Sequence, residues 1–368
     1  MRVKLKDITK FSKGTQINGK NLIDDGAYSY LNGGINPSGK WNEFNVAENT
    51  VTISEGGNSS GYVNYMSKAF WCGAHCYYLY DGPKNSKYLY YALKSQQERL
   101  FRIRSGACMP NIKKSDLGNF IIEYEEDETR QEEVVKVLEK CELLIEDYNK
   151  KLALLDEAVR ARFVEMFGTL HDNENRFNIV TIEEVCSIIK DGTHQTPHYT
   201  EDKINGYKFL SSKDVMSQKI DWKNIKYIPK DLHEKLYASI QPQRNDILMS
   251  KNGVNYGVAA VNDTDEVFDI YVSLALLRPK QLIDPVFFRC VINSIETKRQ
   301  FDMSIKGIGV PNLHLGEIKK TKIILPPMVL QKQFVTFVKQ IDKSRSRIQK
   351  SLEASRELFD CLMQEYFG

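Results

Sequence analysis

The sequence predicts an α+β protein made of two pseudo-repeated mixed α/β domains, separated by two long helices that form an antiparallel coiled coil. The first observation is a repeated motif: GACMPNIKKSDL begins at residue 106 and GIGVPNLHLGEI at residue 307. The two copies are 201 positions apart, far more than the roughly 20–50 residues of a solenoid repeat. The second observation is a pair of heptad patterns offset by 200 residues. Both indicate that one unit occurs twice.

Other segments repeat in the same order, which makes chance a poor explanation. VKLKDITKFSKGT (3–15) parallels VTIEEVCSIIKDGT (180–193), and NTVTISEGGNSSG (49–61) parallels NDILMSKNGVNYG (245–257). Short β-branched or aromatic runs such as CYYLY and DILMS, bounded by Gly and Asn, are typical of strands. Shorter helices are expected around 87–102 and 285–301.

The two long helices give the clearest pattern. Apolar side chains step by four and three residues, which predicts a helix that seeks a helical partner. The alternative is two separate amphipathic helices, each packed on its own domain. The acidic run 125–128 and the proline pair 326–327 suit the starts of these helices. The predicted seam comprises Val134, Leu138, Cys141, Ile145, Tyr148, Leu152 and Leu155 in the first helix, and Phe334, Val338, Ile341, Ile348 and Leu352 in the second.

The charge is unevenly distributed along the 368 residues, although the total is only +3. Residues 1–122 hold 16 Lys and Arg against 9 Asp and Glu, whereas residues 123–168 hold 7 against 14. A basic globular segment followed by an acidic helix suggests a domain that faces nucleic acid. No apolar run reaches the length of a membrane span, and seven cysteines at irregular spacing favour a reducing compartment.

The order of these features resembles the specificity subunit of a Type I restriction-modification system. The second motif with its double proline, GIGVPNLHLGEIKKTKIILPPMVLQKQF, is close to that family's pattern, whereas the first copy has IIEYEEDETRQEEV where the family usually has prolines. The resemblance implies target-recognition domains at 1–124 and 173–326, a central helix at 125–172 and a C-terminal helix at 327–368. Each domain would read half of an interrupted sequence in double-stranded DNA.

The resemblance also implies partners and a cellular location. The helices would dock two modification (methyltransferase) subunits, and restriction (endonuclease/translocase) subunits would join through the complex. The chain would need no cofactor, have no catalytic residue of its own and work in the prokaryotic cytoplasm, away from membranes. A stand-alone nuclease and a coiled-coil scaffold that binds only protein are the competing hypotheses.

Polar loops at matching positions are the candidate DNA contacts, because Gly lets the backbone approach phosphates while amides and hydroxyls reach base edges. Ordinary hairpin turns would carry the same Gly and Asn residues. The candidates are Lys13, Thr15, Gln16, Lys20, Ser54, Gly57, Asn58, Ser59, Ser60, Tyr62, Lys113 and Lys114 in the first half, and Lys190, Thr193, His194, Gln195, Thr196, Ser250, Lys251, Asn252, Asn255, Tyr256 and Lys306 in the second.

Three signals typical of enzymes fail on inspection. GINPSGK at 34–40 has the spacing of a P-loop, but Trp41 follows where Ser or Thr should bind magnesium. Cys72, His75 and Cys76 have no second ligand pair at zinc-site spacing, so burial in a strand is expected and no metal. His194 and His198 are four residues apart, but they lie in a stretch that contains Thr and Pro, so the helical geometry of an HExxH metal motif is absent. Separately, TEDK from Thr200 offers a Glu-x-Lys, but a nuclease also needs a partner acid placed by a strand, which the sequence does not show. The chain is therefore interpreted as a binder that gives specificity to enzymes on other chains.

Overall fold

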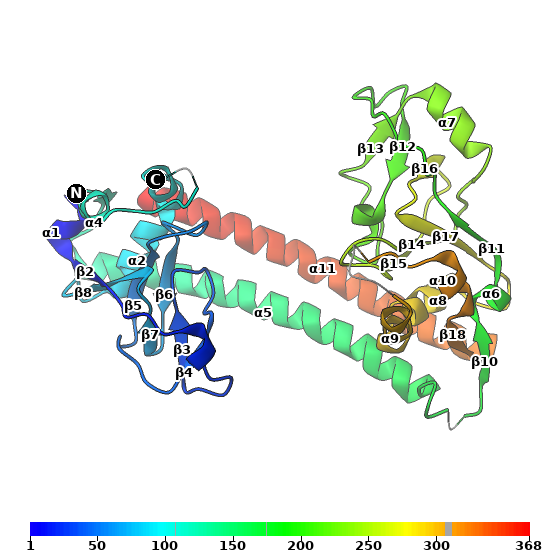
Figure 1. Cartoon of the computed structure of the whole chain (residues 1–368), viewed down its shortest axis with the longest axis horizontal. Coiled ribbons are helices and arrows are strands. Elements are labelled where there is room, and N and C mark those ends of the chain that lie inside the picture. Colours follow the sequence, from blue (N-terminus) through cyan, green and yellow to red (C-terminus); the bar gives the residue numbers. More distant parts are fainter. Residues whose placement is uncertain (107, 174, 306–310) are drawn as a thin grey trace. The chain divides into compact units, whose positions relative to one another are not determined.

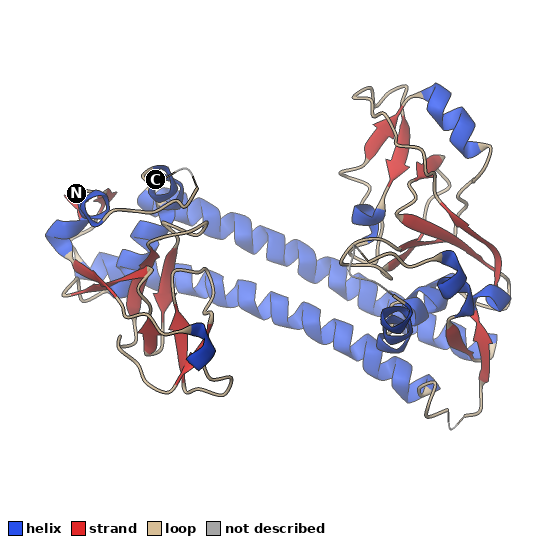
Figure 2. Ribbon diagram, viewed as in Figure 1, coloured by secondary structure: helices blue, strands red, loops and turns tan. Residues whose placement is uncertain are grey.

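The computed structural model describes residues 1–106, 108–173, 175–305 and 311–368. Two compact units divide the chain: residues 1–151 with 348–368, and residues 152–347. Each unit therefore combines one globular region with a part of both long helices (Figures 1 and 2). The expected fold class, two mixed α/β repeats with two long helices, is confirmed.

The described residues of unit 1 form three small sheets, four short α-helices and the 3-10 helix η1. A four-stranded antiparallel sheet has the order β2-β8-β5-β6, and a three-stranded sheet has the order β4-β3-β7 with β3 and β7 parallel. A third sheet pairs β1 with β9 next to the start of the long helix α5. The elements are β1 (Arg2–Lys4), α1 (Leu5–Ile8), β2 (Lys10–Lys13), η1 (Gly19–Asn21), β3 (Tyr28–Leu31), β4 (Gly39–Trp41), β5 (Thr50–Ser54), β6 (Val63–Met66), β7 (Phe70–Cys72), β8 (Cys76–Tyr80), α2 (Ser86–Ser95), α3 (Gln97–Arg102), α4 (Lys114–Gly118), β9 (Ile121–Glu123) and α5 (Glu128–Phe167).

Unit 2 repeats this topology strand for strand. Its sheets have the orders β11-β17-β14-β15, β13-β12-β16 and β10-β18, and β12 is parallel to β16 as β3 is to β7. Helix α7 has no counterpart among the residues of unit 1 that the structure describes. The elements are β10 (Asn178–Thr181), α6 (Ile182–Val185), β11 (Cys186–Asp191), β12 (Tyr207–Leu210), η2 (Ser212–Val215), β13 (Lys226–Ile228), α7 (Lys230–Tyr237), β14 (Ile247–Ser250), β15 (Ala259–Val261), β16 (Phe268–Ile270), β17 (Leu274–Pro279), α8 (Pro285–Ile292), α9 (Ile295–Ser304), α10 (Leu315–Lys320), β18 (Lys322–Leu325) and α11 (Met328–Phe367).

A Gly-Thr pair follows β2 and β11 in the two repeats, and the close approach of another backbone explains the glycine. A Cβ on Gly14 would lie 1.9 Å from the Cys72 carbonyl oxygen, and one on Gly192 would lie 2.3 Å from the oxygens of Ile270 and Tyr271. The next residue then donates its backbone N–H to the parallel strand: Thr15 to Cys72 and Thr193 to Ile270, both at 2.9 Å. The glycine is needed because the two backbones touch.

The two long helices pack in opposite directions within each unit. In unit 1 the guanidinium of Arg130 near the start of α5 lies 5.9 Å from the ring centre of Tyr366 near the end of α11. In unit 2 the rings of Phe163 near the end of α5 and Phe334 near the start of α11 are 5.6 Å apart. The antiparallel arrangement predicted from the heptads is therefore present in both units.

Burial along the helical seam is uneven. Val134, Leu138 and Cys141 on α5, and Phe334, Val338 and Leu352 on α11, are buried. Val134 and Leu138 belong to the core of unit 1, and Phe334 and Val338 to that of unit 2, so side chains of a globular region cover the seam at these four positions as well. The remaining predicted seam residues, Ile145, Tyr148, Leu152, Leu155, Ile341 and Ile348, are half-buried.

Candidate nucleic-acid interface

The repeated Pro-Asn motif packs against the loop that follows the central strand of the four-stranded sheet. In unit 1 the Gly57 N–H donates to the Pro110 carbonyl and the Ile112 N–H donates to the Glu55 carbonyl, both at 2.9 Å. Unit 2 repeats these bonds, from Gly253 to Pro311 at 3.0 Å and from Leu313 to Lys251 at 2.8 Å. The motif therefore recurs because it supports this loop in each half.

The two loops share one backbone conformation. Gly57 and Gly253, three residues after the last strand residue, both have a positive φ, and so do Gly61 and Gly257. Only glycine adopts these angles without strain, so the glycines fix the shape of each loop. An added Cβ on Gly57 or Gly253 would meet nothing within 4 Å, which leaves both positions open to a ligand.

Four candidate side chains in these loops, or at the end of the strand before each loop, are turned inward. Ser54, Ser60, Ser250 and Lys251 are buried. The Ser60 hydroxyl donates to the Glu55 carbonyl and the Ser250 hydroxyl to the Asn255 carbonyl, both at 2.8 Å. These four side chains are therefore turned inward in the structure, and their contact with DNA stays a prediction.

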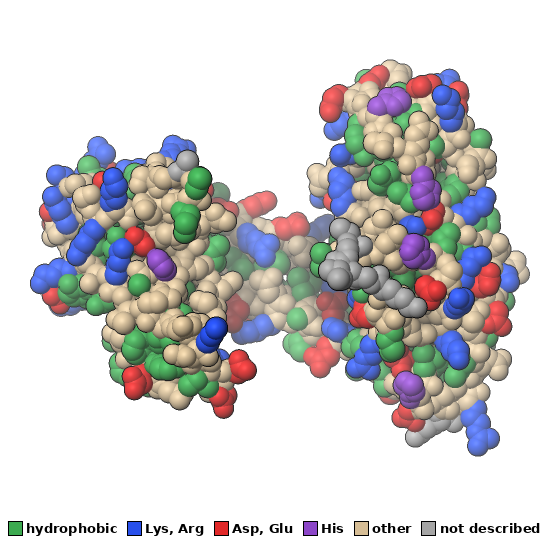
Figure 3. Space-filling model, in the orientation of Figure 1, with side chains coloured by type: hydrophobic (Ala, Val, Ile, Leu, Met, Phe, Trp, Pro, Cys, Tyr) green, Lys and Arg blue, Asp and Glu red, His purple; other side chains and the backbone are tan. Residues whose placement is uncertain are grey.

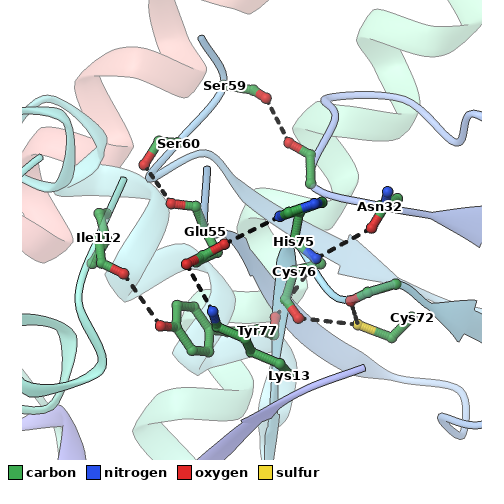
Figure 4. Close-up of polar contacts among 12 residues, drawn as sticks. Lys13, Asn32, Glu55, Ser59, Ser60, Cys72, His75, Cys76, Tyr77 and Ile112 are labelled. Atoms are coloured by element: carbon green, nitrogen blue, oxygen red, sulfur yellow. Dashed lines mark hydrogen bonds and ion pairs between the residues drawn. The ribbon is translucent and has the colours of Figure 1, made fainter. Parts of the chain in front are cut away.

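The acidic side chain of Glu55, beside the unit 1 loop, contacts both the candidate Lys13 and the neighbouring His75 (Figure 4). The Lys13 ammonium lies 2.7 Å from Glu55 Oε1, and His75 Nδ1 lies 3.4 Å from Glu55 Oε2. Below them the Tyr77 hydroxyl donates to the Ile112 carbonyl at 3.2 Å. Burial, together with the nearby Glu55 charge, raises the pKa of Tyr77 to about 12, so this hydroxyl keeps its proton.

Unit 2 has the same arrangement with the charges exchanged. Asp191 occupies the β11 position equivalent to Lys13, and Lys251 follows β14 where Glu55 follows β5. Their charged atoms are again 2.7 Å apart, and His194 Nε2 lies 3.7 Å from the Asp191 carboxylate. Unit 1 thus has the more exposed cation, since 45% of the Lys13 side chain is accessible against 5% for Lys251.

Neither Glu55 nor Asp191 is among the residues predicted from sequence, although a comparison of the two repeats contains a signal for both. Between SKGT and KDGT a Lys becomes Asp, and between SEGG and SKNG a Glu becomes Lys. Opposite charge changes at two positions of an internal repeat indicate that the two positions touch in both copies.

A basic groove of about 490 Å³ lies beside the unit 1 loop. Lys13, Lys113 and Lys114 line it, with Asn111 and Glu55. Residues about 100 positions apart in sequence thus meet because the Pro-Asn segment crosses the end of the sheet. In Figure 3, basic side chains gather over this face of unit 1, with a histidine among them. At the equivalent positions of unit 2, His314 and Leu315 replace Lys113 and Lys114, so the two halves offer different surfaces.

The remaining candidates lie near these loops or on segments that leave them. Asn58 and Asn255 are exposed at the loop tips, and Ser59 donates to the Gly33 carbonyl at 2.5 Å. Asn252 and Tyr256 are half-buried, as is Tyr62, whose ring lies 3.8 Å from the Lys94 ammonium. Thr193 is half-buried, and Lys306 lies outside the described residues. The exposed candidates on the segments after β2 and at the end of β11 are Thr15, Gln16, Lys20, Lys190, His194, Gln195 and Thr196.

The Cys72, His75 and Cys76 group considered from sequence does not come together as a metal cluster in the structure. Cys72 and Cys76 are buried in β7 and β8, and the side chain of His75 points to Glu55 instead. No group of three or more His, Cys, Asp or Glu among the described residues could hold a metal ion. Within the same residues, no helix is both long and apolar enough to cross a membrane.

Comparison with known proteins gives one consistent result. The family model for the type I restriction modification DNA specificity domain matches residues 1–156 and 174–355. A protein of Mycoplasma pneumoniae named as a type I specificity subunit is 35% identical over 169 residues, which are 45% of this chain and 44% of that protein. One of Mycoplasma genitalium is 26% identical over 96% of this chain and 90% of its own. The crystal structure of an S subunit from M. genitalium superposes with a TM-score of 0.65 at 20% identity, covering 100% of this chain and 96% of that one.

Proposed function

This chain belongs to the family of type I restriction-modification DNA specificity proteins, and on that premise we propose that each of its globular regions reads one half of an interrupted DNA site. The proposed recognition domains are residues 1–124 and 173–326. The proposed spacer and docking helices are residues 125–172 and 327–368. The chain supplies sequence specificity, and the chemistry is carried out by other subunits in the prokaryotic cytoplasm.

The observation that carries the proposal is the loop that both repeats build next to the Pro-Asn motif. Its glycines leave open backbone, its tip presents an exposed Asn, and in unit 1 three lysines line the adjoining groove. Lysines bind DNA phosphates independently of the base sequence, whereas polar groups at the loop tip can reach base edges and so distinguish base pairs. The exchanged charges at Lys13–Glu55 and Asp191–Lys251 give the two halves different chemistry. A protein built this way would read two unlike half-sites.

The helices supply a surface for partner proteins. Leu143, Leu144 and Leu154 on α5 are exposed, at 63%, 47% and 60%. Leu143 and Leu144 are adjacent, and Leu154 lies about three helical turns further along α5. Exposed apolar side chains of this kind favour burial against a partner protein. We infer that two modification subunits dock on the helices and that restriction subunits join through them.

The test is a domain exchange in the assembled methyltransferase. Residues 1–124 are replaced by the equivalent region of a relative with a different target, and methylated sites are mapped in the presence of the cognate modification subunits. We expect one half-site to change while the other half-site and the gap are kept. The matched exchange of residues 173–326 should change the other half-site. If either exchange altered both half-sites, the regions would not be independent readers.

A further inference from the structure

Each unit has its own junction between the globular region and the long helices. In unit 2 this junction contains a cavity, whereas in unit 1 a side chain occupies the equivalent space. The helices correspond with an offset of 200 residues, so Glu142 on α5 in unit 1 matches Asp342 on α11 in unit 2. The short helices α2 and α8 also correspond, because each begins directly after a capping side chain, Asn85 and Asp284. Positions on both sides of the junction can therefore be compared one by one.

In unit 1 a tyrosine fills the junction. The Tyr91 hydroxyl donates to Glu142 Oε2 at 2.7 Å, and the Lys87 ammonium lies 3.2 Å from the same oxygen. The Tyr91 ring is fully buried, with its centre 6.4 Å from that of Phe359 on α11. Burial and the Glu142 carboxylate raise the pKa of Tyr91, so the phenol remains neutral.

In unit 2 smaller side chains stand at these positions. Cys290 lies six residues after the capping Asp284, as Tyr91 lies six residues after the capping Asn85, so the two positions are equivalent. Val159 on α5 is equivalent to Phe359 on α11, because the long helices correspond with an offset of 200 residues. A cavity of about 470 Å³ lies there, lined by Cys290 and Val159 together with Val338, Phe334 and Met216. The cavity thus occupies the part of the junction where unit 1 holds a phenol ring.

The polar groups of this cavity have unused hydrogen-bonding capacity. The Arg289 side chain is only 11% exposed and its Nη2 lies 3.7 Å from Asp342 Oδ2. No acceptor among the described residues reaches its buried Nε. Lys219 and Arg345 also lie near the Asp342 carboxylate, at 3.7 and 3.9 Å. Arg345 is held more closely by Asp156, at 2.5 Å, so Asp342 is the carboxylate shared by Arg289 and Lys219. A buried donor that has no partner among the described residues, such as Arg289 Nε, is costly.

We propose that this cavity binds a phenol-sized aromatic ring that carries a hydroxyl group. The hydroxyl donates to Asp342, as the Tyr91 hydroxyl does to Glu142, and its oxygen accepts from Arg289 Nε. The ring contacts Val159, Val338 and Cys290. A free phenol or a tyrosine side chain of another protein has this chemistry. The site is separate from the loops proposed to read DNA, so either proposal can fail without the other.

The direct test is fluorine NMR of 4-fluorophenol with the full-length chain. We expect saturable binding with a Kd on the order of 0.1–1 mM, the range open to so few non-hydrogen atoms. p-Cresol should displace the probe, whereas toluene, which lacks the hydroxyl, should do so at least about tenfold less well. Displacement by a capped Gly-Tyr-Gly peptide would identify a protein side chain as the ligand, and failure of the peptide would identify a free small molecule.

Two variants separate the cavity from other binding. Cys290→Tyr should fill the cavity as unit 1 does and weaken probe binding more than about tenfold, with an unchanged or higher melting temperature. Cys361→Tyr, at an exposed position of α11, is the matched control and should bind like the wild type. Arg289→Met, needed if Cys290→Tyr does not fold, should make p-cresol and toluene equal competitors. Absence of saturable binding up to 10 mM, or equal binding by Cys290→Tyr, would overturn the proposal.

Discussion

Removing the three lysines of the unit 1 groove should weaken DNA binding by an amount that depends on salt. Each lysine that neutralises a phosphate contributes about 0.9 to the slope of log affinity against log salt. Lys113 and Lys114 are exposed and free to contribute fully, whereas Lys13 is held by Glu55 at 2.7 Å and contributes less. Changing all three to Gln should therefore lower the slope by about 1.8–2.7. Between 50 and 200 mM KCl the wild type should lose about 12–40-fold more affinity than the variant.

The assay is fluorescence anisotropy of a labelled 30-base-pair duplex titrated with the full-length chain at four salt concentrations. Changing Lys136, Lys140 and Lys151 to Gln is the control, because these exposed lysines lie on α5 and the net charge changes equally. The control should keep the wild-type slope to within about 0.5. If both variants gave the same slope, total charge and not the groove would determine binding, and the assignment of this interface would be wrong.

Two further predictions concern a tight backbone contact and the gap between half-sites. Gly192→Ala places a Cβ 2.3 Å from two carbonyl oxygens. The clash should cost about 3 kcal/mol of stability and lower the melting temperature of that region, measured by calorimetry, by roughly 6–12 °C. The control Gly19→Ala has open space around the new Cβ and should leave the melting temperature nearly unchanged, so similar melting temperatures for the two variants would refute the contact. Inserting four residues near Lys150 adds about 6 Å and one helical turn, so methylation mapping should show one or two extra base pairs between unchanged half-sites. Inserting a single residue should instead disrupt the pairing of the helices. An active four-residue variant that kept the original gap would show that the helices do not set the distance between half-sites.

The repeat, the helices and the fold class could be predicted from sequence because they depend on local periodicity and on comparison of the chain with itself. Heptad spacing alone places Leu138 and Val338 on the seam, and both side chains are buried. Half-burial of Tyr148 could not be foreseen, since it depends on whether a globular region also covers that stretch of helix. Heptad spacing identifies the face of a helix but not everything that packs on it.

The candidate interface was only partly predictable, because its geometry depends on strand order. Gly57 was identified by its turn chemistry, but the contact of its N–H with the Pro110 carbonyl joins segments more than 50 residues apart. The sequence marks Ser250 only as a polar residue beside a loop, whereas in the structure its hydroxyl donates to the Asn255 carbonyl inside that loop. Composition shows that a loop is polar, whereas only the fold shows which polar groups are turned inward.

The hydrophobic core of unit 1 includes residues from both the beginning and the end of the chain, which has a consequence for synthesis on the ribosome. Met363 and Phe367, near the end of α11, belong to the same hydrophobic core as Leu5 and Leu138. Unit 1 needs residues 348–368, which emerge about 200 residues after residue 151. At roughly 5–20 residues per second the first globular region waits about 10–40 s for its last core side chains. During that time its apolar surface is uncovered, so the half made first is the half completed last.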